Sequence, residues 1–133
     1  MIIARKLSGC AKVMRNNKMS IVVAGGHGNT GKMLKSVNIL TINLQEKSTS
    51  NWALLGALNY ARSYFPSVGI IDSSLIVTAG KLEETEGEQS VEYYENIDST
   101  QHWVVLDSMT LRRSKFSHST VSVTQEWCWS ESP

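Results

Sequence analysis

Residues 52–65 read WALLGALNYARSYF, and residues 103–116 read WVVLDSMTLRRSKF. The two stretches match in identity or close type at six positions without a gap, from Trp52 and Trp103 to Phe65 and Phe116, at a distance of 51 residues. Self-similarity at a period of about 50 residues is typical of solenoids and propellers, in which one supersecondary unit recurs and packs against its neighbours. The repeat therefore predicts a fold of adjacent units and a function located on the surface that they build.

Each tryptophan is preceded by the same order of apolar runs and turns. Ala24-Gly25-Gly26 ends a run in the first copy, and Ala79-Gly80-Lys81 is aligned with it in the second. Ser36-Val37 and Ser90-Val91 open the next runs. Short β-branched or aromatic runs between turn residues indicate strands. The expected strands are 9–14, 19–25, 36–43 and 51–56 in the first copy, 65–71, 74–79, 90–95 and 102–107 in the second, and 116–123 at the start of a third.

Over roughly residues 5–123 the chain resembles the kelch-repeat family of β-propellers. The resemblance is carried by the strand that ends in Gly25-Gly26, the run from Ser90 to Tyr94, the spaced tryptophans, and Arg62 and Arg113. The chain departs from the family pattern at Lys81, and at Leu40 or Ile42, which replace the expected tyrosine of the first copy. The tail from Thr124 to Pro133 does not continue into the expected Gly-Gly strand.

The resemblance implies an all-β fold, an incomplete kelch-type β-propeller with two four-stranded blades plus an extra strand. The expected units are residues 5–61, residues 62–112, and residues 113–133 as an opening strand with an irregular tail. Propellers typically have about 4–8 blades. We therefore expect a fragment, a short isoform, or a chain that completes its ring with other copies. Uncovered blade edges predict self-association or aggregation. The expected core residues are Val37, Trp52, Leu55, Val91, Trp103 and Leu106.

The composition is that of an ordinary globular protein. The formal net charge is +1, with 41% hydrophobic and 19% charged residues, which gives no electrostatic case for binding nucleic acid or an acidic membrane. No apolar run approaches the roughly 18 residues of a membrane-spanning helix. The two cysteines, Cys10 and Cys128, do not form a disulfide framework, and reduced thiols predict a cytoplasmic location.

A glycine-rich stretch offers an alternative function. Gly26 to Lys32 reads GHGNTGK and fits the first seven places of a phosphate-binding P-loop, but Met33 stands where a serine or threonine should bind magnesium. The spacing of Gly25, Gly28 and Gly31 also resembles a dinucleotide-binding turn. Both motifs require a following helix, whereas the near alternation of β-branched residues in 32–44 favours a strand. A P-loop or Rossmann-type nucleotide-binding enzyme using the loop from Gly25 to Lys32 is the alternative.

Other chemistry finds little support in the sequence. His27, His102 and His118 form no pair or cluster at zinc-ligand spacing. The acidic run from Glu83 to Glu88 lacks the spacing of a calcium-binding EF-hand loop and is expected to be a solvated loop. We therefore expect no catalytic residue, no metal and no cofactor.

The main functional prediction is a protein–protein interaction module, a kelch-repeat scaffold or adaptor fragment without catalysis. The resemblance implies that the loop after Gly26 and the opening segment of each unit meet at one mouth of the channel, where a partner protein could contact several blades. Arg62 and Arg113 are expected to be structural. By position, the candidate partner-binding residues are His27, Asn29, Ser63, Tyr64, Ser114 and Lys115.

Overall fold

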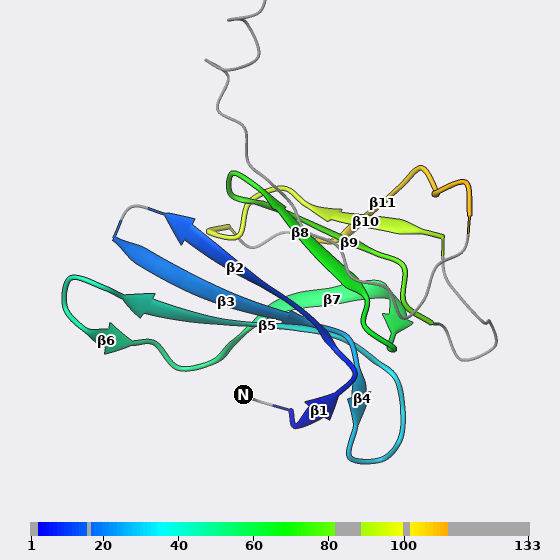
Figure 1. Ribbon diagram of the computed structural model, residues 1–133, viewed down its shortest axis with the longest axis horizontal. Coiled ribbons are helices and arrows are strands. Elements are labelled where there is room, and N and C mark those ends of the chain that lie inside the picture. The colour runs from blue at the N-terminus through cyan, green and yellow to red at the C-terminus, as the bar shows by residue number, and fades with distance from the viewer. Residues whose placement is uncertain (1–2, 16, 82–88, 100–101, 112–133) are drawn as a thin grey trace, which may run out of the picture.

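The computed structural model of the chain describes residues 3–15, 17–81, 89–99 and 102–111. All regular elements in these ranges are β-strands, and every strand pair is antiparallel (Figure 1). This confirms the predicted all-β, propeller-like fold. No helix in the described ranges is long and apolar enough to cross a membrane. The expected strand 116–123 and the arginine at position 113 lie outside the described residues.

The first sheet corresponds to the first predicted blade. It contains β2 (Gly9–Arg15), β3 (Lys18–Ala24), β5 (Leu34–Asn43), the short β6 (Ser48–Thr49) and β7 (Ala53–Arg62), in the order β2-β3-β5, with both β6 and β7 paired to β5. The sheet thus has one short strand more than expected. A separate two-stranded ladder joins β1 (Arg5–Lys6) to β4 (His27–Gly28) at one end of this sheet.

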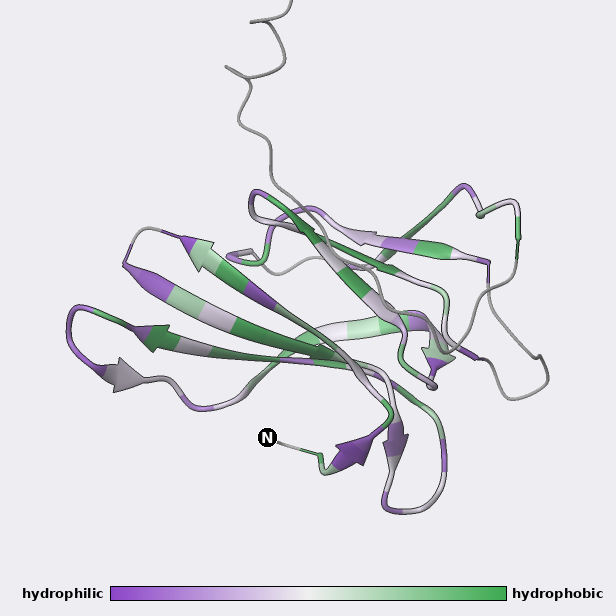
Figure 2. Cartoon of the chain, viewed as in Figure 1, coloured by the Kyte–Doolittle hydropathy of each residue, from purple (hydrophilic) through white to green (hydrophobic). Residues whose placement is uncertain are grey.

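The second sheet has the four strands expected for a blade. They are β8 (Ser67–Ile71), β9 (Ser74–Thr78), β10 (Val91–Tyr94) and β11 (Val104–Leu106), in spatial order β11-β10-β9-β8. The sheet lies over the first one, with β8 next to β2 (Figure 1). Figure 2 shows hydrophobic residues along β3, β5 and β8, and hydrophilic residues in β1 and β4.

The hydrophobic core lies between the two sheets. Val22 and Val37 of the first sheet and Leu75 and Val77 of the second are completely buried. Among the predicted core residues, Val37, Leu55 and Trp103 are buried, and Trp52 and Val91 are half-buried.

The structure contradicts the prediction that Leu106 is a core residue, because its side chain is 43% exposed. Leu106 pairs with Val91, the neighbour of Glu92. Successive side chains of a strand point to opposite faces. Because Glu92 points toward the first sheet, where it contacts β7, Val91 and Leu106 lie on the face that points away from it.

The strand registers define which residues of the two units are equivalent. Ala24 pairs with Val37 in the first sheet, and Thr78 pairs with Val91 in the second, an offset of 54 residues. Asn38 pairs with Leu54, and Glu92 pairs with Val105, so the fourth strands are offset by 51 residues and the two tryptophans are equivalent, as predicted.

The predicted alignment of the glycine turns is wrong by one residue. Gly25 corresponds to Ala79, and Gly26 corresponds to Gly80. The backbone shows the same equivalence, because φ is 63° and 97° in the first pair and 60° and 86° in the second. The predicted alignment matched glycine to glycine. The turn instead requires two consecutive left-handed residues, and in the second unit Ala79 is the first of them. A Cβ at Gly80 would lie 2.7 Å from the carbonyl oxygen of Ser63, so the close approach of the chain also requires glycine there.

Candidate functional site

Four of the six predicted partner-binding residues lie within the described ranges, at the end of the molecule that carries β1 and β4 (Figure 1). The His27 ring in β4 meets the Tyr64 ring edge-on, with ring centroids 5.7 Å apart. The Nζ atom of Lys81 lies 5.4 Å from the centroid of the same tyrosine ring, within the range of a cation–π contact. We call these three residues the Tyr64 cluster. It brings together side chains from both units.

Lys81 was not among the predicted site residues, although the sequence contains the signal for it. His27 and Lys81 occupy equivalent positions, each directly after the two left-handed residues of its turn. The one-residue error in the alignment placed Lys81 in the turn itself and hid the equivalence. In the structure, the backbone N–H of Lys81 donates to the Ser63 carbonyl at 2.8 Å, and the N–H of Ser63 donates to the Lys81 carbonyl at 3.1 Å. These bonds hold Lys81 beside the Tyr64 ring.

Asn29 and Ser63 have different surroundings. Asn29 is exposed and lines a hollow of about 370 Å³ together with His27 and Arg5. Ser63 is completely buried, so its side chain cannot contact a partner at this surface, and the prediction that Ser63 binds directly is wrong. Its contribution is the backbone bridge to Lys81. The candidates at positions 114 and 115 lie outside the described residues.

The backbone around the Tyr64 cluster is strained. Tyr64 and Phe65 have φ values of 56° and 61°, and Leu7, at the opening of the first unit, has 57°. A left-handed conformation costs roughly 1–2 kcal/mol for a residue other than glycine, and such residues concentrate at functional sites. The N–H of Phe65 donates to the Leu7 carbonyl at 3.0 Å, which joins the two opening segments. Phe65 is 50% exposed, so its ring adds an apolar group to this surface.

An arginine in each unit binds the backbone that supports this surface. Arg62 is completely buried and donates to the carbonyl oxygens of Ala79 (2.9 Å) and Ser90 (3.1 Å) and to the Ser90 hydroxyl (2.6 Å). Its Nη2 atom also donates to Oε1 of Glu92 at 3.0 Å. Arg62 is therefore structural, as expected from its position in the repeat.

Arg5 repeats this arrangement in the first unit. It donates to the carbonyl oxygens of Gly25 (2.9 Å) and Ser36 (2.8 Å), to the Ser36 hydroxyl (2.9 Å), and to Oδ1 of Asn38. Burial lowers the pKa of Arg5 below its ordinary value. Neither Arg5 nor the acceptor Glu92, which is equivalent to Asn38, was predicted from the sequence pattern.

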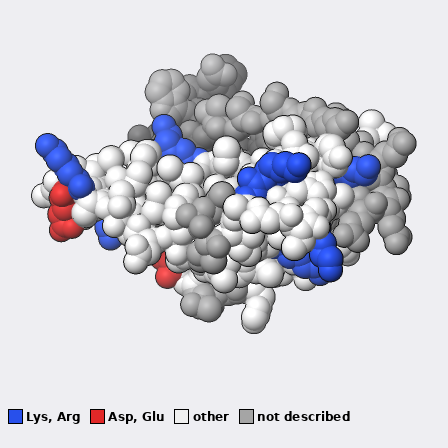
Figure 3. Space-filling model, turned by 90° about the horizontal axis from the view of Figure 1, so that it is seen from below, with Lys and Arg blue, Asp and Glu red and all other residues white. Residues whose placement is uncertain are grey.

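The described charges near the Tyr64 cluster are basic. Lys6 pairs with His27 in the β1–β4 ladder and is exposed, and Lys81 contributes a second ammonium group. In the view from below, the half of the molecule away from the β5–β6 hairpin shows basic side chains and no acidic one among the described atoms (Figure 3). The arrangement can therefore receive an acidic or aromatic group, with Tyr64 and Phe65 as the apolar contacts.

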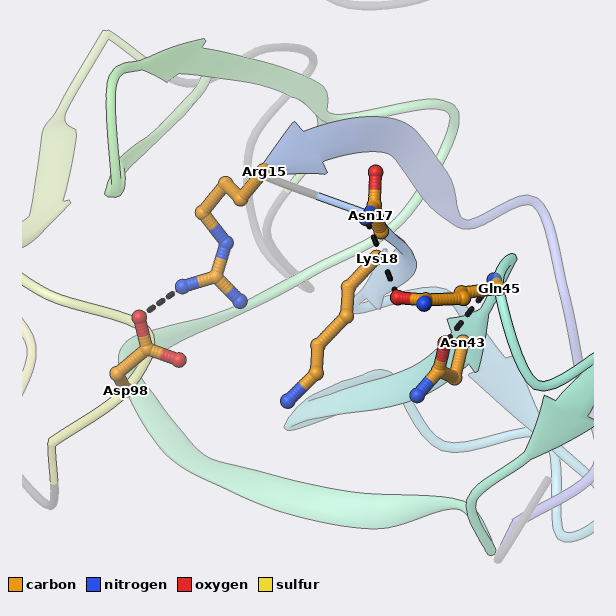
Figure 4. A pocket seen from close by; sticks show the side chains of 6 residues that line it. All are labelled: Arg15, Asn17, Lys18, Asn43, Gln45 and Asp98. Carbon is orange, nitrogen blue, oxygen red and sulfur yellow. Dashed lines mark hydrogen bonds and ion pairs between the residues drawn. The ribbon is translucent and has the colours of Figure 1, made fainter.

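A second hollow, of about 300 Å³, lies at the opposite end of the sheets (Figure 4). Arg15 at the end of β2 forms an ion pair with Asp98, which follows β10, and so links the two sheets. Exposed ion pairs of this kind contribute only about 0–1 kcal/mol. The Nδ2 atom of Asn17 donates to Oε1 of Gln45 at 3.4 Å. The described residues that line the hollow all have polar side chains, and none of them has a positive φ.

The glycine-rich loop does not have the geometry of a nucleotide site. It is followed by the strand β5, so the helix that both motifs require is absent from residues 34–43. Two amides that a phosphate would need are used within the loop, because Gly28 N–H donates to the Lys32 carbonyl and Gly31 N–H to the Gly28 carbonyl, both at 3.0 Å. In the described residues, no group of three histidine, cysteine or acidic side chains could hold a metal ion.

Comparison with known proteins supports the fold. No family model matches the sequence, and no curated protein matches it. Among solved structures, the chain is similar to YjhT, with a TM-score of 0.56 and 20% sequence identity over 93% of this chain. YjhT has a β-propeller-like fold, and the chain spans about a third of its length (34%). At this level of identity, the similarity establishes the fold alone.

Proposed function

We propose that the chain is a protein–protein interaction module, a kelch-type propeller segment that acts as a scaffold or adaptor without catalysis. The Tyr64 cluster is the observation that carries this proposal. It joins side chains of both units on a strained backbone, beside an exposed phenylalanine. Aromatic and basic side chains are enriched at the centres of protein interfaces.

The repeated arginines support the kelch assignment. In each unit an arginine ahead of the opening strand binds the turn after the second strand and the serine that opens the third. The same framework holds both turns in place, so His27 and Lys81, the residues directly after the two turns, lie beside the Tyr64 ring at one end of the molecule. This end is the proposed partner surface. A cytoplasmic location is part of the proposal and is supported by Cys10, an exposed free thiol.

The experiment uses the full chain as bait, followed by calorimetric titration of the purified partner. Tyr64→Ala and Lys81→Ala should each weaken binding by more than about 1 kcal/mol, as expected for contacts near an interface centre. Asn17→Ala and Gln45→Ala, at the opposite hollow, are the matched controls and should leave the affinity unchanged. Unchanged affinity in both Tyr64→Ala and Lys81→Ala would place the partner elsewhere and overturn the proposed site.

A further inference from the structure

The packing between the two sheets, here called the inner interface, joins two distinct faces. The first sheet contributes Val22, Val37 and Leu55, and the second contributes Leu75, Val77, Tyr94 and Trp103, all of them buried. Two directional bonds fix the arrangement. Nε1 of Trp103 donates to the Leu55 carbonyl at 3.0 Å, and Nδ2 of Asn59 donates to the Trp103 carbonyl at 2.9 Å.

One face of the second sheet points away from the inner interface. This outer face carries residues equivalent to those with which the first sheet forms the inner interface. By the register offsets, Ile76, Val91 and Leu106 correspond to Val22, Val37 and Leu55. We call these three residues, with Val104, the Leu106 face. Leu55 is 6% exposed, whereas its equivalent Leu106 is 43% exposed. A hollow of about 610 Å³, lined by Val91, Val105, Leu106 and Asp107, lies beside it.

The first sheet has the complementary outer face. Ile21, Val23, Leu40 and Trp52 correspond to Leu75, Val77, Tyr94 and Trp103. We call these four residues the Trp52 face. Trp103 is only 4% exposed, whereas Trp52 and the other three residues of this face are half-buried. The two sheets together therefore have two outer faces on opposite sides. The Leu106 face is equivalent to one side of the inner interface, and the Trp52 face is equivalent to the other side.

We propose that the chain self-associates head to tail, with the Leu106 face of one copy packed on the Trp52 face of a second copy in the arrangement of the inner interface. In this contact the indole of Trp52 fills the hollow beside Leu106 and donates to the Leu106 carbonyl, as Trp103 does to Leu55. The occupant is a second copy because the internal repeat itself shows how these two faces fit. The contact is heterologous, because it joins two different faces. Each added copy therefore leaves one face free for the next copy, and the assembly grows until the rotation between copies closes a ring.

The polar residues of the inner interface are only partly reproduced in this contact. Glu92, which accepts hydrogen bonds from β7, is replaced on the Trp52 face by Asn38, whose Oδ1 is already bound by Arg5. We therefore expect the contact between copies to be weaker than the packing within one chain and to depend on protein concentration.

Sedimentation velocity of the full chain over a range of concentrations tests the proposal. Leu106→Glu and Leu40→Glu, one on each face, should each raise the dissociation constant at least about tenfold, the change for a loss of one well-packed contact. Leu44→Glu is the matched control, because Leu44 is 45% exposed, lies in the turn that follows β5, and is not one of the residues that define either face. It should leave the dissociation constant unchanged.

Mixing the two face variants gives the decisive result. Leu106→Glu retains an intact Trp52 face, and Leu40→Glu retains an intact Leu106 face, so an equimolar mixture should form a one-to-one dimer that cannot extend. Melting curves establish that each variant folds, and Trp52→Phe, which removes only the indole N–H and part of the ring, provides a milder second test. A wild-type chain that stays monomeric at all concentrations, or two folded monomeric variants that fail to combine, would overturn the proposal.

Discussion

Arg62 and Glu92 form a fully buried ion pair that connects the end of β7 to the middle of β10, with 3.0 Å between Nη2 and Oε1 and both side chains 0% exposed. The pair is well satisfied, because the carboxylate also accepts hydrogen bonds from the backbone N–H groups of Asn59 and Tyr60 and from the Asn59 amide. One carboxylate thereby holds the end of β7, the last strand of the first sheet, against the second sheet.

Glu92→Ala should destabilise the chain strongly, because it leaves the Arg62 charge buried without its partner. Removing one member of a buried ion pair costs roughly 3–5 kcal/mol. Glu92→Gln keeps the shape and should cost less. Urea denaturation followed by tryptophan fluorescence measures both, with Asp107→Ala, an exposed carboxylate beyond β11, as control. A loss below about 1 kcal/mol for Glu92→Ala would contradict the pairing, given that surface changes fall within about 0.5 kcal/mol.

The two equivalent tryptophans should respond differently to truncation. Trp103→Ala removes a ring that is 4% exposed and packs on Tyr94 with 5.2 Å between centroids, and should cost about 3–5 kcal/mol. Trp52→Ala should cost less than half as much when the free energy of unfolding is measured at a concentration where the chain is monomeric. Equal losses at the two positions would mean that Trp52 is as buried as Trp103.

Ala79→Gly should change the stability only slightly, because two costs offset the relief of strain. Ala79 has a φ of 60° and is completely buried. Relief of the left-handed strain, about 1–2 kcal/mol, is offset by the added backbone entropy of glycine, about 0.5–1 kcal/mol, and by the loss of one buried methyl group, about 0.8 kcal/mol. Gly80→Ala is the matched opposite change and should destabilise in thermal unfolding, since its Cβ would lie 2.7 Å from the Ser63 carbonyl oxygen. A loss of about 1.5 kcal/mol or more in Ala79→Gly, which is the sum of the two costs without any relief of strain, would show that the left-handed conformation is not the populated one.

Ser63→Ala should be neutral or stabilising. The Ser63 hydroxyl is buried and has no hydrogen-bond partner among the described residues, and burial of an unpaired hydroxyl costs about 1–3 kcal/mol in proteins. Replacement by alanine removes that cost and keeps the backbone bridge to Lys81. Differential scanning calorimetry should show an equal or higher melting temperature. A clear decrease would mean that the hydroxyl has a partner and that its role goes beyond the backbone.

The sequence predicted most of the fold because the relevant signals are local. The alternation of apolar residues and the turn residues predicted all eight main strands of the two units, with boundaries within a few residues for seven of them. The exception is β7, which continues to Arg62 rather than ending at residue 56. A β-bulge pattern in β7, with Gly56 at a φ of 77°, allows the extension. The repeat also placed the two tryptophans correctly, because their spacing follows from the register.

The site was only partly predictable. Tyr64 and His27 were identified by position, but the alignment missed Lys81, and Ser63 proved to be buried. Phe65 carries no motif that separates it from a core aromatic. Its exposure follows from the left-handed backbone at Tyr64 and Phe65, which turns the ring outward.

The sequence by itself determined the strands, the period and the equivalence of Trp52 and Trp103, because each depends on residues that are near neighbours in the chain. The tertiary structure alone decided which tryptophan is buried, which carboxylate pairs with Arg62, and which apolar side chains of the described residues are exposed. Glu92 lies 30 residues from Arg62 in the chain, and contacts at such separations arise only when one sheet stacks on another. The neighbouring sheet thus determines whether a residue is buried. Equivalent residues differ in their exposed fraction because only one member of each pair lies between the two sheets.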